Sequence, residues 1–217
     1  GAIEFIQKAT ASGVVCSIGH TAAAPEDIRQ GIEAGARLST HLGNGAHGTI
    51  RRHPNYIWEQ LADDRLIACL ITDGHHLPES VVKCVVRVKG TENCLITCDA
   101  SGLAGCPPGR YEEPGLEVEV LEDGRVVVAG QRQYLAGSGA STDECVGWAT
   151  RLAEISLSQA CEMAGNQVAQ LFEMEQIRLE KGSTADLTLF ESEPGSGIIR
   201  ILSTISGGDL VFGAIPD

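Results

Sequence analysis

The fold is decided by residues 66–99, which read LIACLITDGHHLPESVVKCVVRVKGTENCLITCD. Two apolar runs, residues 66–72 and 94–98, flank a segment that begins at Pro78, carries valines at helical spacing and ends at Gly90. Continuous apolar strands joined by a helix are typical of a parallel sheet covered on both faces. The stretch therefore predicts a strand–helix–strand unit of an α/β fold.

The same pattern occurs twice upstream. Residues 13–18 form an apolar run that precedes a helix beginning at Pro25, and residues 37–40 form a second run that precedes a helix opened by Pro54. Proline suits the first turn of a helix, where its missing N–H costs no hydrogen bond. Four such βα units are half the number in a closed (β/α)8 TIM-like barrel. We therefore expect half of such a barrel.

The pattern changes after residue 99. Residues 116–120 and 125–128, joined through Asp123-Gly124, predict a β-hairpin, because Asp-Gly favours a tight two-residue turn. The hairpin is an expected insertion near residues 114–134. A capping box at Ser141 predicts the start of a helix, and a second helix follows from Ser156 or Ser158.

The C-terminal part predicts short strands over residues 185–190 and 199–212, separated by turns with glycine and proline. We expect them to form part of a small β-sandwich. This divides the chain into a half-barrel of residues 1–175, with the hairpin, and sandwich strands within residues 176–217.

Composition excludes several classes of function. The 217 residues carry 16 basic and 29 acidic side chains, a net charge of −13, which argues against nucleic acid or an anionic membrane as partner. No apolar run approaches the roughly 18 residues of a membrane span, and no leader peptide opens the sequence. We expect a cytoplasmic protein. Its eight cysteines include no CxxC pair, and we expect them to be free thiols in the core.

Four polar residues stand at the ends of the four predicted strands: His20, His41, His76 and Asp99. The carboxyl ends of the strands are where (β/α)8 barrels build their active sites. Imidazoles on neighbouring strands can converge on one metal ion, and an Asp beside them can be a ligand or a general base. Two histidines are one ligand short of an ordinary catalytic zinc site.

A set of motifs in this order resembles the N-acetylglucosamine-6-phosphate deacetylases of the amidohydrolase superfamily. The motifs are Ser17-Ile18-Gly19-His20-Thr21, Thr40-His41-Leu42-Gly43-Asn44-Gly45, Thr72-Asp73-Gly74-His75-His76, Thr97-Cys98-Asp99-Ala100, Leu135-Ala136-Gly137-Ser138, Ala164-Gly165-Asn166 and Gly182-Ser183-Thr184-Ala185-Asp186-Leu187. The resemblance covers nearly the whole chain and implies the C-terminal half of the barrel.

The resemblance implies metal-dependent hydrolysis of the acetamide of N-acetylglucosamine 6-phosphate, giving glucosamine 6-phosphate and acetate. It implies one divalent ion, zinc before iron, manganese or cobalt, and a phosphorylated amino sugar as the small-molecule partner. The implied metal ligands are His20 and His41, and Asp99 is the implied catalytic acid and base. The implied substrate-binding residues are Asn44, Gly45, Arg52, His76, Leu135, Ala136 and Gly137.

One feature of the site also follows from the residues themselves. Arg51-Arg52-His53 is a basic cluster in an acidic chain, and an arginine there can hold a phosphate through two parallel hydrogen bonds. The alternatives are that the cluster is a solvated loop, or that His53 caps the helix that Pro54 opens.

The sequence also departs from the family pattern. Gly43 and residues 45–47 replace an aromatic residue and an Asn-Ala-Met run, and no glutamate matches the family's metal-binding Glu. The early His-x-His strand of the family has no counterpart either. We expect the partner of this chain to be either a second copy, in a homodimer that buries the sheet edges, or a separate N-terminal half.

Three other interpretations stay open. The first is a dihydroorotase-like hydrolase of cyclic amides, and the second is a catalytically incomplete fragment that only forms a half-barrel assembly. A Rossmann-type binding module is weaker, because Gly102-Leu103-Ala104-Gly105 and Gly137-Ser138-Gly139 do not form a GxGxxG turn between strand and helix.

Overall fold

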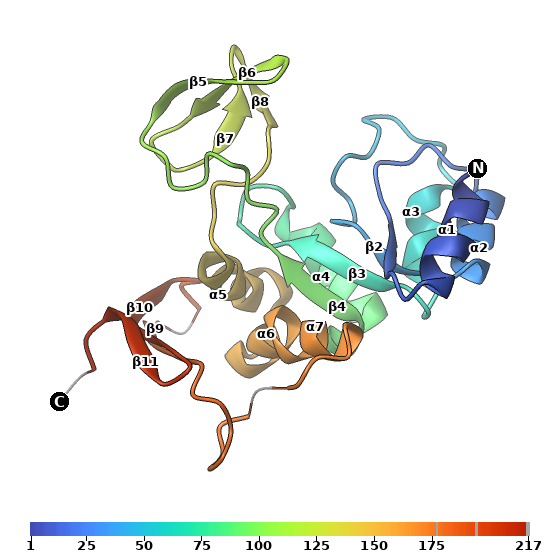
Figure 1. Cartoon of the computed structure of the whole chain (residues 1–217). Helices are drawn as coiled ribbons and strands as arrows, with labels where there is room; N and C mark the ends of the chain where they lie inside the picture. The colour runs from blue at the N-terminus through green and yellow to red at the C-terminus, as the bar shows by residue number, and fades with distance from the viewer. Residues whose placement is uncertain (177, 194, 216–217) are drawn as a thin grey trace.

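A computed structural model describes residues 1–176, 178–193 and 195–215. The fold is mixed α/β, with one parallel sheet packed against helices and two separate antiparallel sheets (Figure 1). The strands of the parallel sheet are β1 (Cys16–Ile18), β2 (Ala36–Ser39), β3 (Ile67–Ile71) and β4 (Cys94–Thr97). The helices between them are α2 (Pro25–Glu33), α3 (Tyr56–Ala62) and α4 (Glu79–Lys89), with α1 (Ala2–Ala11) before the sheet and a 3-10 turn over Thr91–Asn93.

The parallel sheet confirms the four predicted strands and their connections. Its order is β1-β2-β3-β4, so strands that follow one another along the chain pair directly. In β3, Ala68 and Leu70 are completely buried, and the strand pairs with β4 through Cys69 and Leu95. Helices α4, α5 and α6 cover the face of the sheet that carries Ala68, Leu70, Cys94 and Ile96.

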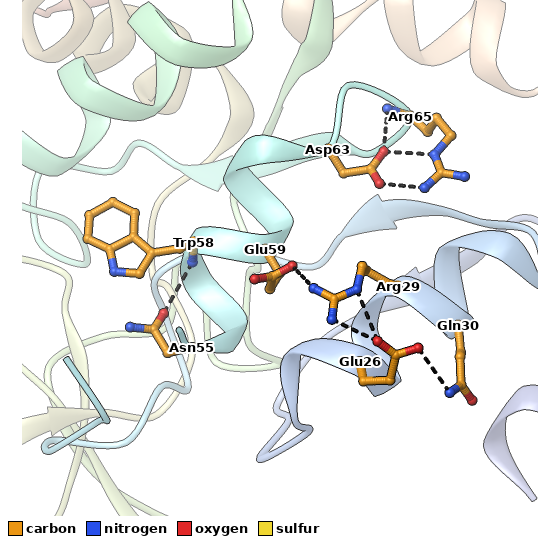
Figure 2. Close-up of polar contacts among 8 residues, drawn as sticks. All are labelled: Glu26, Arg29, Gln30, Asn55, Trp58, Glu59, Asp63 and Arg65. Atoms are coloured by element: carbon orange, nitrogen blue, oxygen red, sulfur yellow. Dashed lines mark hydrogen bonds and ion pairs between the residues drawn. The ribbon is translucent and has the colours of Figure 1, made fainter. Parts of the chain in front are cut away.

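The helix boundaries follow the expected caps, with one correction. Pro25 is the first residue of α2, and Gly90 ends α4 with φ 75°. Helix α3 begins at Tyr56 instead of at Pro54, because the side chain of Asn55 accepts hydrogen bonds from the N–H groups of Ile57 and Trp58 (Figure 2). Asn55 is therefore the N-cap, and the proposal that His53 caps this helix is wrong.

Arg29 connects α2 to α3. Figure 2 shows its guanidinium between two carboxylates, with Nη2 2.7 Å from Glu26 Oε2 and Nη1 2.7 Å from Glu59 Oε2. Glu26 and Arg29 lie on the same helix, whereas Glu59 lies on α3. Because both pairs are exposed to solvent, they contribute little to stability, and only the pair with Glu59 joins the two helices.

The predicted hairpin is the centre of a larger antiparallel sheet, which stands apart from the parallel sheet in Figure 1. Its strands are β5 (Gly109–Glu113), β6 (Leu116–Val120), β7 (Val126–Val128) and β8 (Gln131–Leu135), paired in that order. The sequence did not indicate β5 or β8, because GRYEE and QRQYL contain no apolar run. Val118, Val120 and Val126 form a small core of their own within this sheet.

The C-terminal half of the chain adds three helices and a third sheet. The helices are α5 (Thr142–Ala153), α6 (Leu157–Ala164) and α7 (Asn166–Leu171), and the strands are β9 (Leu187–Ser192), β10 (Ile199–Ser206) and β11 (Asp209–Gly213). Both predicted helix starts are confirmed, with capping boxes at Ser141 and Ser156. Among the residues described, none of the helices combines the length and hydrophobicity of a membrane-spanning segment.

All eight cysteines are free, as expected. Cys16, Cys94 and Cys145 are buried, and burial raises the pKa of the Cys145 thiol to about 12. The expectation of core thiols is wrong for Cys84 and Cys161, which are exposed.

The main core lies between β3, β4 and the helices α4, α5 and α6, and Leu70 is at its centre with no exposed surface. We expect Leu70→Ala to lower the free energy of unfolding by about 2–5 kcal/mol, through lost burial and a cavity. Urea denaturation measures the change. Val88→Ala, at a residue 59% exposed, is the control and should change stability by about 0.5 kcal/mol or less. Equal effects of the two substitutions would contradict this description of the core.

Candidate active site

The imidazoles of His20 and His41 meet beyond the ends of β1 and β2. Their Nε2 atoms are 2.9 Å apart, and the ring planes cross at 77° with centroids 4.7 Å apart. Adjacent parallel strands bring these residues together although they are 21 positions apart in sequence. The convergence predicted for these two histidines is therefore present.

The backbone is unusual at three of the four strand ends. His20, His41 and Asp99 have φ values of 45°, 28° and 51°, a region that side-chain-bearing residues rarely adopt. In the described part of the chain only two further non-glycine residues, Glu154 and Glu173, share it. Such conformations cost about 1–3 kcal/mol each and cluster at functional sites. The strain is therefore a structural observation that independently selects the predicted residues.

The pair fits two positions of a metal site. Two nitrogen ligands of one tetrahedral zinc ion lie about 3.3–3.4 Å apart when each Zn–N bond is about 2.0–2.1 Å. The 2.9 Å observed here is within about 0.5 Å of that separation. Among the described residues, no three His, Cys, Asp or Glu side chains gather closely enough to hold a metal. His41 Nδ1 is buried and has no hydrogen-bond partner within the described residues, whereas metal-binding histidines ordinarily donate this N–H to a carboxylate or carbonyl. The chain thus contributes two ligands, and further groups would have to complete the site.

Gly45 packs directly against the His20 ring. It has φ 61°, and a Cβ at this position would lie 2.7 Å from His20 Cε1 and 2.8 Å from Nδ1. Only glycine combines that backbone conformation with so close an approach. Asn44 lies beside Gly45 in the chain. His20, Asn44 and Gly45 line one small pocket, together with Thr21 and Gln60. The predicted residues Asn44 and Gly45 are thus close to the two histidines.

Asp99 lies two residues after the end of β4 and is exposed. Its backbone carbonyl accepts a hydrogen bond from Ser138 N–H at 2.9 Å. The carboxylate joins neither the histidine pair nor an ion pair among the described residues. The structure places Asp99 at the same edge of the sheet as the histidines without bringing it into contact with them.

His76 lines a second pocket, together with Leu135, Gly137 and Trp148. Trp148 closes one side of it, because its indole ring packs against Gly74, where a Cβ would lie 2.8 Å from the ring. Three predicted sugar-binding residues therefore share one pocket. Ala136 does not line this pocket. It packs instead against the valine core of the antiparallel sheet.

Arg52 lies in the exposed loop before α3. Its carbonyl accepts hydrogen bonds from Trp58 Nε1 at 3.3 Å and from Asn55 Nδ2 at 3.3 Å. The guanidinium makes no ion pair within the described residues and lines neither of the two pockets above. The structure therefore holds the backbone of Arg52 in place and leaves its charge exposed.

The sequence interpretation gave no role to Asp73, Ser138 or Trp148. Asp73 accepts a hydrogen bond from His76 Nδ1 at 2.6 Å and another from Ser138 Oγ at 3.0 Å. The position of Asp73, two residues after the end of β3, was the available signal. Nothing in the sequence connects it to Ser138, which lies 65 residues later.

Comparison with known proteins finds relatives that match most of this chain. No protein-family model matches the chain. An N-acetylglucosamine-6-phosphate deacetylase from Lysinibacillus sphaericus is 30% identical over 187 residues, which is 86% of this chain and 48% of the relative. An N-acetylgalactosamine-6-phosphate deacetylase from Shewanella is 29% identical over 217 residues, or 97% of this chain and 52% of the relative.

A solved structure is similar over the same extent. The N-acetyl-D-glucosamine-6-phosphate deacetylase from Mycobacterium smegmatis, in complex with N-acetyl-D-glucosamine-6-phosphate, superposes with a TM-score of 0.85 at 26% identity. The match covers 97% of this chain and 55% of that one. The chain resembles the N-acetylglucosamine-6-phosphate deacetylases. It spans about half the length of the curated deacetylases it matches, and these relatives are enzymes.

Proposed function

We propose that this chain supplies part of the active site of a metal-dependent deacetylase that hydrolyses N-acetylglucosamine 6-phosphate to glucosamine 6-phosphate and acetate. The observation that carries the proposal is the 2.9 Å approach of His20 Nε2 and His41 Nε2 at neighbouring strand ends. The deacetylase relatives, each matched over about half its length, support it. The parallel sheet with its covering helices supports the C-terminal half of a (β/α)8 barrel, and β9–β11 support strands of a small β-sandwich.

The proposed roles follow from the chemistry of each side chain. His20 and His41 hold one divalent ion, zinc in the first instance, which when bound polarises the acetamide carbonyl and lowers the pKa of water. Asp99 accepts the proton from the attacking water as the C–O bond forms, and then delivers it to the leaving nitrogen, after which the C–N bond breaks and acetate and the amine are released. An exposed carboxylate at a strand end is free to move this proton in both directions.

The remaining residues bind and orient the substrate. His76, Leu135 and Gly137 line one pocket and would contact the sugar, with Ala136 next to them in the chain. Asn44 and the backbone of Gly45 would bind near the phosphate, and the exposed guanidinium of Arg52 would supply its countercharge.

The position of Gly45 gives a prediction about the metal ligands. Gly45→Ala should push the His20 ring away from His41 and weaken zinc binding by about 10–100-fold, the range seen when groups that orient a ligand are altered. Competition with a chromophoric chelator measures the affinity. Gly48→Ala is the matched control, since a Cβ at Gly48 would meet nothing within 4 Å. Unchanged zinc affinity in Gly45→Ala would argue against His20 as a ligand.

Arg52 gives a prediction about the substrate. Arg52→Ala should raise KM for a 6-phosphorylated sugar by about 10–100-fold, because a hydrogen bond between charged groups contributes roughly 1.5–3 kcal/mol. The same substitution should hardly change KM for the unphosphorylated N-acetyl sugar. Steady-state kinetics on both sugars measure the difference, and an equal effect on the two would refute phosphate recognition at this position.

The substrate itself is tested by acetate release. The relatives include deacetylases named for N-acetylglucosamine 6-phosphate and for N-acetylgalactosamine 6-phosphate, so both epimers are assayed with the complete protein that carries this chain. We expect hydrolysis of the gluco epimer to be the faster. Faster release from the galacto epimer would correct the substrate, and hydrolysis of a cyclic amide such as dihydroorotate alone would refute the proposal.

A further inference from the structure

The carboxylate of Asp73 is the centre of a buried hydrogen-bond network beyond the end of β3. Its side chain is 3% exposed, and that of His76 is 9% exposed. Asp73 Oδ1 accepts from the backbone N–H groups of His75 and His76, each at 2.9 Å. Asp73 Oδ2 accepts from Ser138 Oγ at 3.0 Å and faces His76 Nδ1 at 2.6 Å. The two oxygens therefore have separate sets of partners.

This division determines which nitrogen of His76 carries the proton. Burial raises the pKa of the Asp73 carboxyl, but the hydrogen bonds from the His76 side chain and from the two backbone N–H groups together hold the pKa below its ordinary value. Asp73 is thus ionised at neutral pH and can only accept. The proton must then lie on His76 Nδ1, which leaves Nε2 as the ring's free acceptor whenever His76 is neutral.

Ser138 joins this network to the neighbouring strand end. Its Oγ accepts from Ala140 N–H at 3.0 Å, so its own proton is directed to Asp73. Its backbone N–H donates to Asp99 O, and its carbonyl accepts from Ser101 N–H, both at 2.9 Å. Ser138 is 1% exposed. One buried serine therefore connects the backbone of Asp99 to the carboxylate that holds His76.

We propose that Asp73 and Ser138 are positioning residues that hold His76 in its Nδ1–H tautomer, so that Nε2 accepts a hydrogen bond from a sugar hydroxyl. The identity of the ligand rests on the proposed function. The tautomer rests only on the contacts given above. Neither residue needs to touch the substrate, because each acts through His76.

Asp73→Asn tests the tautomer with almost no change in shape. The two backbone N–H groups keep the amide oxygen at the Oδ1 position, so the amide nitrogen faces His76 Nδ1 and donates to it. We expect the His76 tautomer to switch from Nδ1–H in the unaltered chain to Nε2–H in the variant. Nitrogen-15 NMR of the imidazoles at about pH 8.5, where an ordinary histidine is neutral, reports the tautomer directly.

Asp123→Asn is the matched control, because Asp123 lines the same pocket but pairs with Arg125 instead of His76. This variant should leave the His76 tautomer unchanged. An Nε2–H tautomer in the unaltered chain would overturn the proposal without any variant. A tautomer that stays Nδ1–H in a folded Asp73→Asn variant would overturn it as well.

Ser138→Ala is the second variant. We expect solvent exchange of the His76 Nδ1 proton to become about fivefold faster, because Oδ2 loses the hydroxyl that shares in holding it, a loss of about 1 kcal/mol. Ser141→Ala, at an exposed serine, should leave the exchange rate unchanged. An unchanged rate in Ser138→Ala would remove Ser138 from the proposed role.

Titration with N-acetylglucosamine 6-phosphate separates this inference from the proposed function. We expect the sugar phosphate to shift the His76 Nε2 resonance in the complete protein that carries this chain, with about tenfold weaker binding to its Asp73→Asn variant. A different outcome is that the tautomer switches in the variant while the sugar phosphate leaves the Nε2 resonance unchanged. That result would refute both the sugar as the ligand of His76 and the proposed function. It would leave the tautomer assignment intact.

Discussion

Asp99→Asn should reduce kcat for deacetylation by about 10²–10⁴-fold, the contribution typical of a positioned general acid or base. The amide has nearly the shape of the carboxylate but cannot accept a proton from water. The exposed position of Asp99, with no ion pair in the described part of the chain, means that the substitution leaves no partner unpaired. Steady-state kinetics of the complete protein on the N-acetylated sugar phosphate measure the loss.

The metal content distinguishes loss of the base from loss of the site. Zinc bound by Asp99→Asn should equal that of the unaltered protein, because the proposed ligands His20 and His41 remain. Asp143→Asn, at a half-buried carboxylate that accepts a hydrogen bond from the Ser141 hydroxyl, is the control and should retain its activity. Near-normal turnover by Asp99→Asn would remove Asp99 from its role as acid and base.

His41→Ala should weaken zinc binding by more than the roughly 100-fold that accompanies loss of an outer-shell partner, since it removes a ligand itself. The ring is 7% exposed, so the substitution also leaves a small cavity, and circular dichroism must show that the fold is retained. His47→Ala is the matched control, because His47 lies in the same loop but its Nδ1 is 2.9 Å from Tyr56 Oη. Equal zinc affinity of the two variants would contradict the proposed site.

Much of the fold could be predicted because local rules agree with the tertiary structure. The strands around Leu70 and Leu95 are apolar throughout, and their helices begin at prolines and capping boxes that the sequence displays. Strand β8 could not be found in this way. Its residues Gln131, Arg132 and Gln133 are exposed and owe their conformation to pairing with β7, which is a tertiary interaction.

Part of the candidate site could likewise be predicted from the sequence, and part of it depends on tertiary structure. His20 and His41 were predictable because polar residues that end consecutive parallel strands must lie at one edge of a sheet. Their left-handed backbone was not, since nothing in either sequence context requires it. The network of Asp73 with Ser138 was not predictable either, because a hydrogen bond across 65 residues depends on how the loops after β3 and β8 are packed.

A zinc titration of this 217-residue chain, observed through the nitrogen-15 resonances of its six histidines, tests the shared metal site most directly. If His20 and His41 bind one ion together, their Nε2 resonances will shift in parallel and reach a plateau at one zinc per chain, while those of His47 and His76 stay unchanged. Separate titration of the two rings, or no response from either, would contradict a metal site at this end of the sheet.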